Sequence, residues 1–236
     1  MECQPTVFWD FDGTLGYREG MFSGALYKVL KELMPESTIT IKDIGPFLQQ
    51  GFPWQQPKES YCHLSNPKDW WFVIEDIFYK AYKGLGVDDK YAKELAKSAH
   101  ECYINPEGFL LYEDTIETLK YFCNKGWRNV ILSNHVPELP QIVNSLGLGG
   151  YIYKCISSAN IGYEKPNSES FYIALASAGN PNEVWMVGDS LKADIEGAES
   201  VGIKAILVHT DNKVDTKYYS KELKGVIDII EKGASY

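Results

Sequence analysis

The chain has 236 residues, of which 44% are hydrophobic and 23% charged, so it reads as a globular protein with one large α/β domain or a core and a smaller companion. Its 23 basic and 32 acidic side chains give a net charge of −9, which disfavours nucleic acid and anionic membranes as partners because both reward clustered Lys and Arg. No apolar run reaches membrane-spanning length, and five scattered cysteines indicate a reducing compartment rather than a disulfide framework.

The first predicted element is a buried parallel strand that begins at Val7 and runs out into a loop at Asp10. It starts so early that no room is left for a signal peptide, and we expect a cytoplasmic protein. Asp10 and Asp12 flank a single residue, and two such acids repel each other unless a cation or phosphate chemistry uses them. Gly13 permits a sharp turn in which backbone N–H groups converge on an anion.

Residues 17–107 read as helical. An apolar stripe predicts a helix over Met21–Leu33, and a long loop follows over Gly51–Pro67, a length that is often functional. Asn66 caps a helix that starts at Pro67 and is closed by Gly84. A further helix starts at Asp88 or Asp89 and ends at Asn105-Pro106.

From about Phe109 the pattern changes to strands alternating with helices. The predicted elements are a helix over 113–125, a strand over 130–132, a helix over 139–146, a strand over 151–156, a helix over 169–178, a strand over 184–187, a helix over 191–201 and a strand over 205–208. This alternation predicts a Rossmann-like α/β core, a parallel sheet covered by helices on both faces. Residues 1–16 and 109–236 would form that core, and residues 17–108 an inserted all-helical domain.

Polar side chains follow three of the predicted strands, at the edge where open α/β sheets gather ligands. They are Asp10 and Asp12, then Ser133 and Asn134, then Asp189 and Ser190. Lys165 lies in a loop before a helix. Each fragment alone reads as a turn, and only their combination indicates phosphate chemistry.

The run Asp-Phe-Asp-Gly-Thr-Leu over Asp10–Leu15 resembles the first motif of the haloacid dehalogenase superfamily, which consists mostly of Mg²⁺-dependent phosphatases. Ser133, Lys165 and the run Gly188–Asp194 are similar to its other motifs, in the same order. The resemblance implies the phosphatase branch, because the dehalogenase branch does not keep an aspartate at the position of Asp12.

The resemblance also implies roles for the matched residues. Asp10 is expected to attack phosphorus and form an aspartyl-phosphate, while Asp12 protonates the leaving alkoxide and later deprotonates water. Ser133 would bond a phosphoryl oxygen, and Lys165 would supply fixed positive charge.

The cofactor implied by the resemblance is Mg²⁺, which would let two anions approach each other. Its expected ligands are Asp10, Asp189 and, through the carbonyl, Asp12. Asp194 and Ser190 are expected behind these ligands, supporting the residues that contact metal and substrate.

In related proteins an insertion after the first motif forms a helical cap over the site, with hinges here expected at 16–20 and 107–110. The expected substrate-binding residues are Phe11, Thr14, Arg18, Asn134 and Trp54. Packing within the cap is an equal alternative for Trp54 and the expectation for Trp70 and Trp71. His135 is expected near the pocket, although no motif gives it a role.

Three functions remain open at this point. The first is hydrolysis of small phosphate monoesters, with a small phosphorylated metabolite as partner. The second is a phosphosugar mutase that returns the phosphoryl group to its substrate, and the third is a non-catalytic phospho-acceptor or binding protein. The oligomeric state is open, with a monomer as one option.

Overall fold

A computed structural model describes residues 4–210 and 216–233, and its core is built on a six-stranded sheet. The strand order is β5-β4-β1-β6-β7-β8, with every neighbouring pair parallel. The strands are β1 (Thr6–Trp9), β4 (Arg128–Ser133), β5 (Lys154–Ser157), β6 (Val184–Gly188), β7 (Lys204–Val208) and β8 (Tyr219–Ser220). The predicted α/β class is therefore confirmed.

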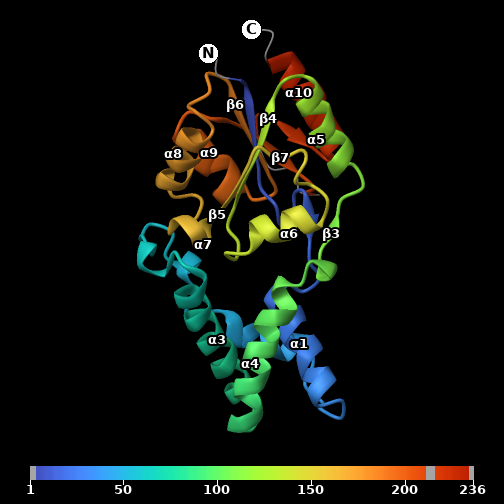
Figure 1. Ribbon diagram of the computed structural model, residues 1–236, viewed down its shortest axis with the longest axis vertical. Helices are drawn as coiled ribbons and strands as arrows, with labels where there is room; N and C mark the ends of the chain where they lie inside the picture. The colour runs from blue at the N-terminus through green and yellow to red at the C-terminus, as the bar shows by residue number, and fades with distance from the viewer. Residues whose placement is uncertain (1–3, 211–215, 234–236) are drawn as a thin grey trace.

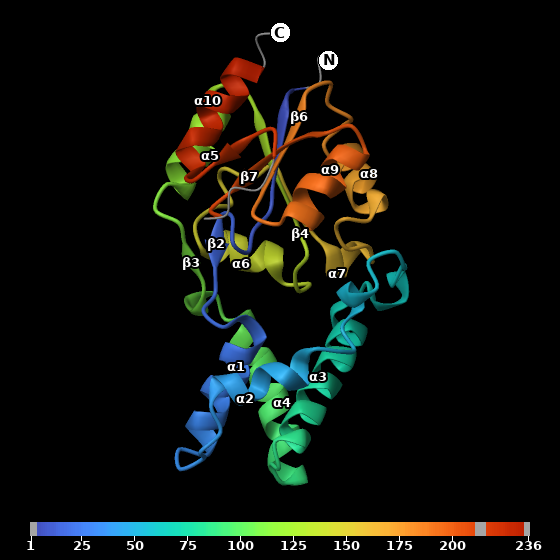
Figure 2. The same cartoon turned by 180° about the vertical axis from the view of Figure 1, so that it is seen from behind.

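Helices cover both faces of this sheet, as Figures 1 and 2 show. Successive residues of β1 point to opposite faces, so Val7 and Trp9 join one hydrophobic cluster and Phe8 joins another. Helices α5 (Thr115–Asn124), α6 (Leu139–Ser145) and α10 (Leu223–Gly233) contribute to the first cluster. Helices α8 (Ser168–Ser177) and α9 (Gly197–Ser200) contribute to the second.

Two elements of the core differ from the predictions. The strand expected over 151–156 is β5, which starts only at Lys154 because its pairing with β4 runs from Val130–Lys154 to Ser133–Ser157. The helix expected over 191–201 is a π-helical segment, η5 (Leu191–Glu196), followed by α9. In this wider turn the Asp194 carboxylate accepts the N–H of Ser190, an irregularity frequent at functional sites.

The region inserted after β1 is helical, as predicted. Its helices are α1 (Met21–Leu33), α2 (Ile41–Ile44), α3 (Pro67–Gly84) and α4 (Asp89–Ile104), and it also carries the 3₁₀ turns η1 (Gly45–Leu48), η2 (Pro53–Gln55), η3 (Cys62–Leu64) and η4 (Pro106–Gly108). The Asn66 side chain accepts the Asp69 N–H at 3.0 Å, which caps α3, and Asp88 caps α4. We call this region the cap; it lies below the sheet in Figure 1.

The two chain segments that join cap and core lie side by side. β2 (Gly16–Tyr17) and β3 (Leu110–Leu111) pair as an antiparallel ribbon at the predicted hinges. Phe11 packs against Phe109 with ring centroids 5.9 Å apart, and one hydrophobic cluster runs from the sheet into the cap. The division into 1–16 with 109–236 and 17–108 stays a prediction.

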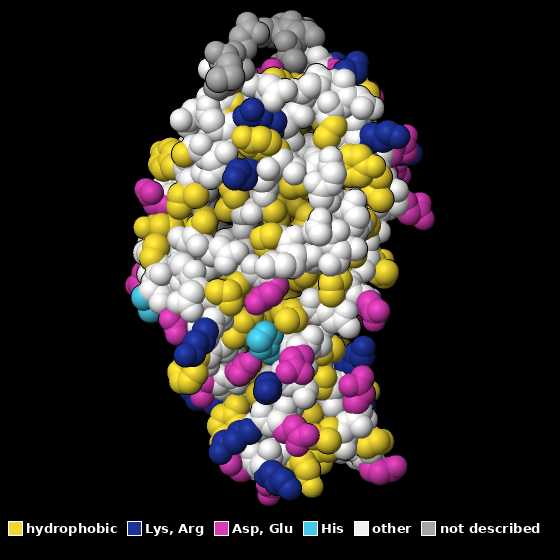
Figure 3. Space-filling model, viewed as in Figure 1, with side chains coloured by type: hydrophobic (Ala, Val, Ile, Leu, Met, Phe, Trp, Pro, Cys, Tyr) yellow, Lys and Arg dark blue, Asp and Glu magenta, His cyan; other side chains and the backbone are white. Residues whose placement is uncertain are grey.

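Acidic and basic side chains are interspersed over the cap surface in Figure 3. Three ion pairs one helical turn apart link such charges on α3 and α4. Within residues 4–210 and 216–233, every helix is too short or too polar to span a bilayer. The cysteines Cys62, Cys102, Cys123 and Cys155 are free thiols, and Cys3 lies outside the described residues.

Candidate active site

Strand ends and one loop bring the predicted catalytic residues to the carboxyl edge of the sheet. Asp10 follows β1, Ser133 ends β4 and Asp189 follows β6. Because β4 and β6 flank β1, these positions are neighbours at the point where the strand order turns back, which is where α/β sheets bind ligands. Lys165 reaches the same place from the loop between α7 (Ser158–Ile161) and α8.

Lys165 is buried and joins two carboxylates. Its Nζ lies 2.9 Å from Oδ1 of Asp10 and 2.5 Å from Oδ1 of Asp194. Burial lowers the pKa of Lys165, but the charges of Asp10 and Asp194 outweigh burial, so the pKa is raised and the ammonium stays charged. The side-chain amide of Asn134 fixes the Lys165 backbone, donating to its carbonyl at 2.9 Å and accepting its N–H at 2.8 Å.

An acidic cluster surrounds the Asp10 carboxylate. Asp10, Asp189 and Asp194 each place one oxygen within 4.8 Å of the others. Partial desolvation, followed by the Asp10 charge, raises the pKa of Asp189 to about 6, while the residue keeps an exposed surface. The Asp194 oxygens are committed to Lys165 and to the Ser190 N–H, so Asp10 and Asp189 carry the oxygens best placed for a cation. Hard oxygen donors whose charges repel each other fit a divalent ion such as Mg²⁺.

The turn after β1 sets the approach of Asp189. Gly13 has φ +81°, and a Cβ there would lie 2.2 Å from Oδ2 of Asp189, so the position requires glycine on both counts. Burial first, and then the charges of Asp10 and Asp189, raises the pKa of Asp12 well above its usual range. A carboxyl group that keeps its proton in this way is suited to donate it to a leaving oxygen.

Buried hydroxyl groups at the site lack hydrogen-bond partners. Within the described protein, Ser133 Oγ and Thr14 Oγ1 have none, and both residues are almost fully buried. Native proteins rarely leave such groups unpaired, so a ligand oxygen or a water molecule is expected to bond them. Ser190 differs, because its Oγ accepts the Ala193 N–H at 3.1 Å and caps η5.

A cavity of about 360 Å³ opens beside Asp12, between core and cap. The core lines it with Asp12, Asn134, His135 and Val136, and the cap with Met21, Phe22, Trp54, Trp70 and Tyr103. Two of the predicted substrate-binding residues, Asn134 and Trp54, thus lie in its wall. We call this space the cap cavity.

The other predicted substrate-binding residues lie outside the cap cavity. The Phe11 side chain is fully buried, packed between Phe109 and His135. Arg18 donates from its guanidinium to the backbone carbonyls of Cys102, Tyr103 and Asn105, so it satisfies the C-terminal end of α4. A Cβ at Gly108 would lie 1.9 Å from this guanidinium, and glycine there makes room for it.

A sequence model of the haloacid dehalogenase-like hydrolase family matches residues 5–202, which includes every residue of the site described above. The chain belongs to this family.

Two curated relatives support the membership of this haloacid dehalogenase-like chain. The haloacid dehalogenase-like hydrolase domain-containing protein 3 of Mus musculus is 28% identical over 151 residues, or 63% of this chain and 59% of that protein. A phosphoserine phosphatase of Thermus thermophilus is 27% identical over 152 residues, or 64% of this chain and 60% of that protein. The chain therefore spans about three fifths of the length of these relatives.

Among solved structures, the magnesium-bound HAD hydrolase YfnB from Bacillus subtilis superposes with a TM-score of 0.72. The match covers 98% of this chain and 100% of that one, at 19% sequence identity. At that identity the likeness concerns the fold, and it extends over core and cap together.

His135, expected near the pocket, lines the cap cavity with Nε2 3.3 Å from Oδ2 of Asp12. Burial lowers the pKa of its imidazole to about 4, so the ring is neutral at pH 7. Sequence reasoning missed Tyr103 and Phe22, which line the same cavity in this haloacid dehalogenase-like chain. Tyr103 and Phe22 read only as apolar helix positions. Their helical spacing predicts that both side chains are buried, but it does not predict that they line a cavity next to Asp12.

A buried pair also ties the cap to the loop that carries Lys165. The Tyr61 hydroxyl donates to Oε1 of Glu164, and the Tyr61 N–H donates to the carbonyl of Gly162 at 2.9 Å. The amide of Asn167 donates to the carbonyl of Pro57 at 2.9 Å. Burial raises the pKa of Glu164 to about 7. These contacts hold the 51–67 loop against the core.

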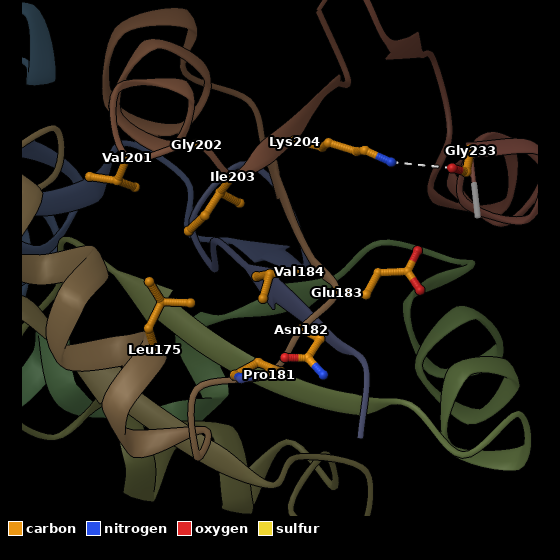
Figure 4. Close-up of a pocket in the computed structure, with 10 residues that line it drawn as sticks. All are labelled: Leu175, Pro181, Asn182, Glu183, Val184, Val201, Gly202, Ile203, Lys204 and Gly233. Carbon is orange, nitrogen blue, oxygen red and sulfur yellow. Dashed lines mark hydrogen bonds between the residues drawn. The ribbon is translucent and has the colours of Figure 1, made fainter. Parts of the chain in front are cut away.

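A cavity of about 450 Å³ lies at the opposite end of the sheet, by the amino ends of β6 and β7 (Figure 4). Its wall contains none of the predicted site residues. Its lysine, Lys204, donates to the carbonyl of Gly233 at 3.2 Å. The carboxyl edge, where the predicted residues gather, is therefore the candidate active site.

Proposed function

We propose that this protein is a Mg²⁺-dependent hydrolase of small phosphate monoesters that works through an aspartyl-phosphate on Asp10. The observation that carries the proposal is the placement of Asp10, whose carboxylate contacts Lys165 at 2.9 Å within the acidic cluster while Asp12 faces an open cavity. The phosphatase among the curated relatives supports the same reaction class.

In the first half-reaction a carboxylate oxygen of Asp10 attacks phosphorus, and the bond from phosphorus to the ester oxygen breaks. The Asp12 carboxyl group gives its proton to the departing oxygen, so an alcohol leaves. The raised pKa of Asp12, caused first by burial, favours the protonated form that donates this proton. Lys165 holds the orientation of Asp10 through its ammonium group.

In the second half-reaction a water oxygen attacks phosphorus and the bond from phosphorus to Asp10 breaks. Asp12, now a carboxylate, takes the proton of that water. Inorganic phosphate leaves, and both aspartates return to their starting states. The unpaired hydroxyl of Ser133 would hold a phosphoryl oxygen in both steps.

Asp10, Asp189 and the carbonyl of Asp12 would hold the Mg²⁺ ion, with Asp194 close behind. A bound Mg²⁺ supplies positive charge that offsets the repulsion between the phosphate and the carboxylates. The pKa of Asp189, raised by burial and the Asp10 charge, is consistent with carboxylates placed together for a cation.

Two other functions make different products. A phosphosugar mutase would isomerise a sugar phosphate and release little free phosphate, and a phospho-acceptor would keep an acyl phosphate on Asp10 without turnover. The yield of free phosphate per ester consumed therefore distinguishes hydrolysis from both alternatives.

The deciding experiment incubates the protein with Mg²⁺ and a panel of phosphate monoesters and measures free phosphate. We expect multiple-turnover release, lost by about 1,000-fold or more in Asp10→Asn. Asp76→Asn, an exposed aspartate on α3, is the matched control and should keep wild-type rates. Wild-type rates in Asp10→Asn would remove Asp10 as the nucleophile.

A further inference from the structure

The cap cavity lies where the leaving group of a phosphate ester would sit if Asp12 donates the proton. Asp12 is one of its lining residues, and the opposite wall comes from the cap. Its composition therefore bears on which alcohol the enzyme releases.

Cations are missing from this wall. Among the described residues that line the cap cavity, none is lysine or arginine. The two nearby basic groups are committed elsewhere, Lys165 to two carboxylates and Arg18 to the end of α4. A carboxylate on the leaving group would lose its hydration here without gaining a cationic partner, and it would also face Asp12.

Aromatic rings make up most of the cap side. Phe22 lies 4.3 Å from Tyr103 and 5.9 Å from Trp54, measured between ring centroids, and Trp54 stacks on Phe52 at 4.3 Å. Such walls are stiff, and they favour flat apolar groups over flexible polar ones.

One uncharged hydrogen-bonding group of a lining residue, the indole N–H of Trp70, lacks a partner in the described protein. The imidazole of His135 also lines the cavity, with Nε2 3.3 Å from Oδ2 of Asp12. The cavity volume of about 360 Å³ exceeds the roughly 150 Å³ of an engineered cavity that binds benzene. One or two rings with a polar atom therefore fit.

We propose that the preferred substrate is the phosphate monoester of an uncharged alcohol that carries a planar aromatic or heteroaromatic ring. This inference rests on the proposed phosphatase function. It disfavours alcohols that carry an amino-acid or second phosphate group, because none of the residues that line the cap cavity is a lysine or arginine that would pair with their negative charge.

The test compares kcat/KM for esters of primary alcohols, whose leaving oxygens differ little in basicity. The substrates are 2-phenylethyl phosphate, a nucleoside 5′-monophosphate, phosphoserine and glycerol 1-phosphate. We expect at least one of the two ring esters to exceed phosphoserine and glycerol 1-phosphate by about tenfold or more. Whichever ring ester is better identifies the ring as carbocyclic or heterocyclic.

The outcomes separate the two proposals. Hydrolysis of none of the esters would overturn the phosphatase function itself. Release of phosphate from phosphoserine or glycerol 1-phosphate at rates equal to or above both ring esters would overturn only the leaving-group inference.

Two variants sharpen the comparison. Trp54→Ala should lower the ratio of ring ester to phosphoserine about tenfold, while Phe72→Ala, a cap aromatic that is 77% exposed, should leave it unchanged. Met21→Arg adds a cation to a lining position that is 40% exposed, and it should raise kcat/KM for phosphoserine relative to wild type. An unchanged ratio in both Trp54→Ala and Met21→Arg would contradict the inference.

Discussion

At the residue scale, the chemistry depends on how four charges share a small volume. Lys165 neutralises about one of the negative charges that Asp10, Asp189 and Asp194 bring together, so the cluster keeps an excess of negative charge when all three are ionised. This excess negative charge destabilises the folded protein when no cation is bound, and it favours the binding of a cation.

Mg²⁺ should therefore stabilise the fold. At 100 times its Kd we expect a gain of about 2.7 kcal/mol in unfolding free energy, measured by thermal or urea unfolding with and without the ion. Asp189→Asn should lose most of that gain. When neither protein has metal, the variant should be more stable than wild type above pH 6, because the pKa of Asp189 in the wild-type protein is raised to about 6 and its ionised form is disfavoured by folding. Equal Mg²⁺ effects in the variant and in Asp76→Asn would exclude Asp189 as a ligand.

Asp12→Asn should separate the two half-reactions. With 4-nitrophenyl phosphate, whose leaving group needs no proton, we expect a burst of about one equivalent of nitrophenol followed by turnover slowed about 100-fold or more. With an alkyl phosphate the burst should be absent, since the first step now lacks its acid. Rapid-mixing absorbance measures the burst, and Asp10→Asn, which should give none, is the control. Wild-type steady-state rates in Asp12→Asn would rule out its acid–base role.

At the scale of elements, the 51–67 loop links the cap to the core, although its regular structure is limited to the short turns η2 and η3. It carries Trp54 into the cap cavity and Tyr61 onto Glu164, a contact between residues 103 positions apart. Glu164 directly precedes Lys165, so the segment that lines the cap cavity also supports the loop that carries Lys165. The cap cavity and the position of the proposed catalytic lysine thus depend on one interface.

The buried Glu164 should make stability depend on pH. Its pKa is raised to about 7 in the folded state, so the folded protein binds the extra proton, and wild-type stability should fall as pH rises from about 4.5 to 7. Relative to Glu164→Gln, the loss should reach up to about 3 kcal/mol above pH 7. Urea unfolding at pH 5 and pH 8 measures it. Glu169→Gln, at an exposed position of α8, should show no such difference between the two pH values.

At the scale of the whole molecule, cap and core share their packing. One hydrophobic cluster includes Trp9 and Val187 of the sheet region together with Leu26 and Phe78 of the cap. The β2–β3 ribbon adds a second link between the two parts. Neither part can expose its share of this cluster without losing apolar burial.

We therefore expect cap and core to unfold in a single transition. Tryptophans report on both parts, with Trp54, Trp70 and Trp71 in the cap and Trp9 and Trp185 in the core. Fluorescence and far-UV circular dichroism should give coincident urea curves with one midpoint. Two separated transitions would show instead that the shared cluster does not couple the parts.

The sequence by itself determined the family, the α/β core and the inserted helices. These follow from local patterns: alternating strands and helices, caps such as Asn66 with Pro67, and polar residues at the ends of strands. The parallel order of the strands then brings Asp10, Ser133 and Asp189 together, because the carboxyl ends of parallel strands lie at one edge of the sheet. Nothing beyond local pattern and topology is needed for that step.

Only the tertiary structure decided how the cap faces the core. It committed Arg18 to the end of α4, set His135 beside Asp12, and turned Phe22, Trp70 and Tyr103 toward one cavity. An apolar stripe predicts which face of a helix is buried, but it does not predict which residues pack against that face. The packing partners are set by contacts between residues far apart in the chain. The cap cavity is made of such contacts.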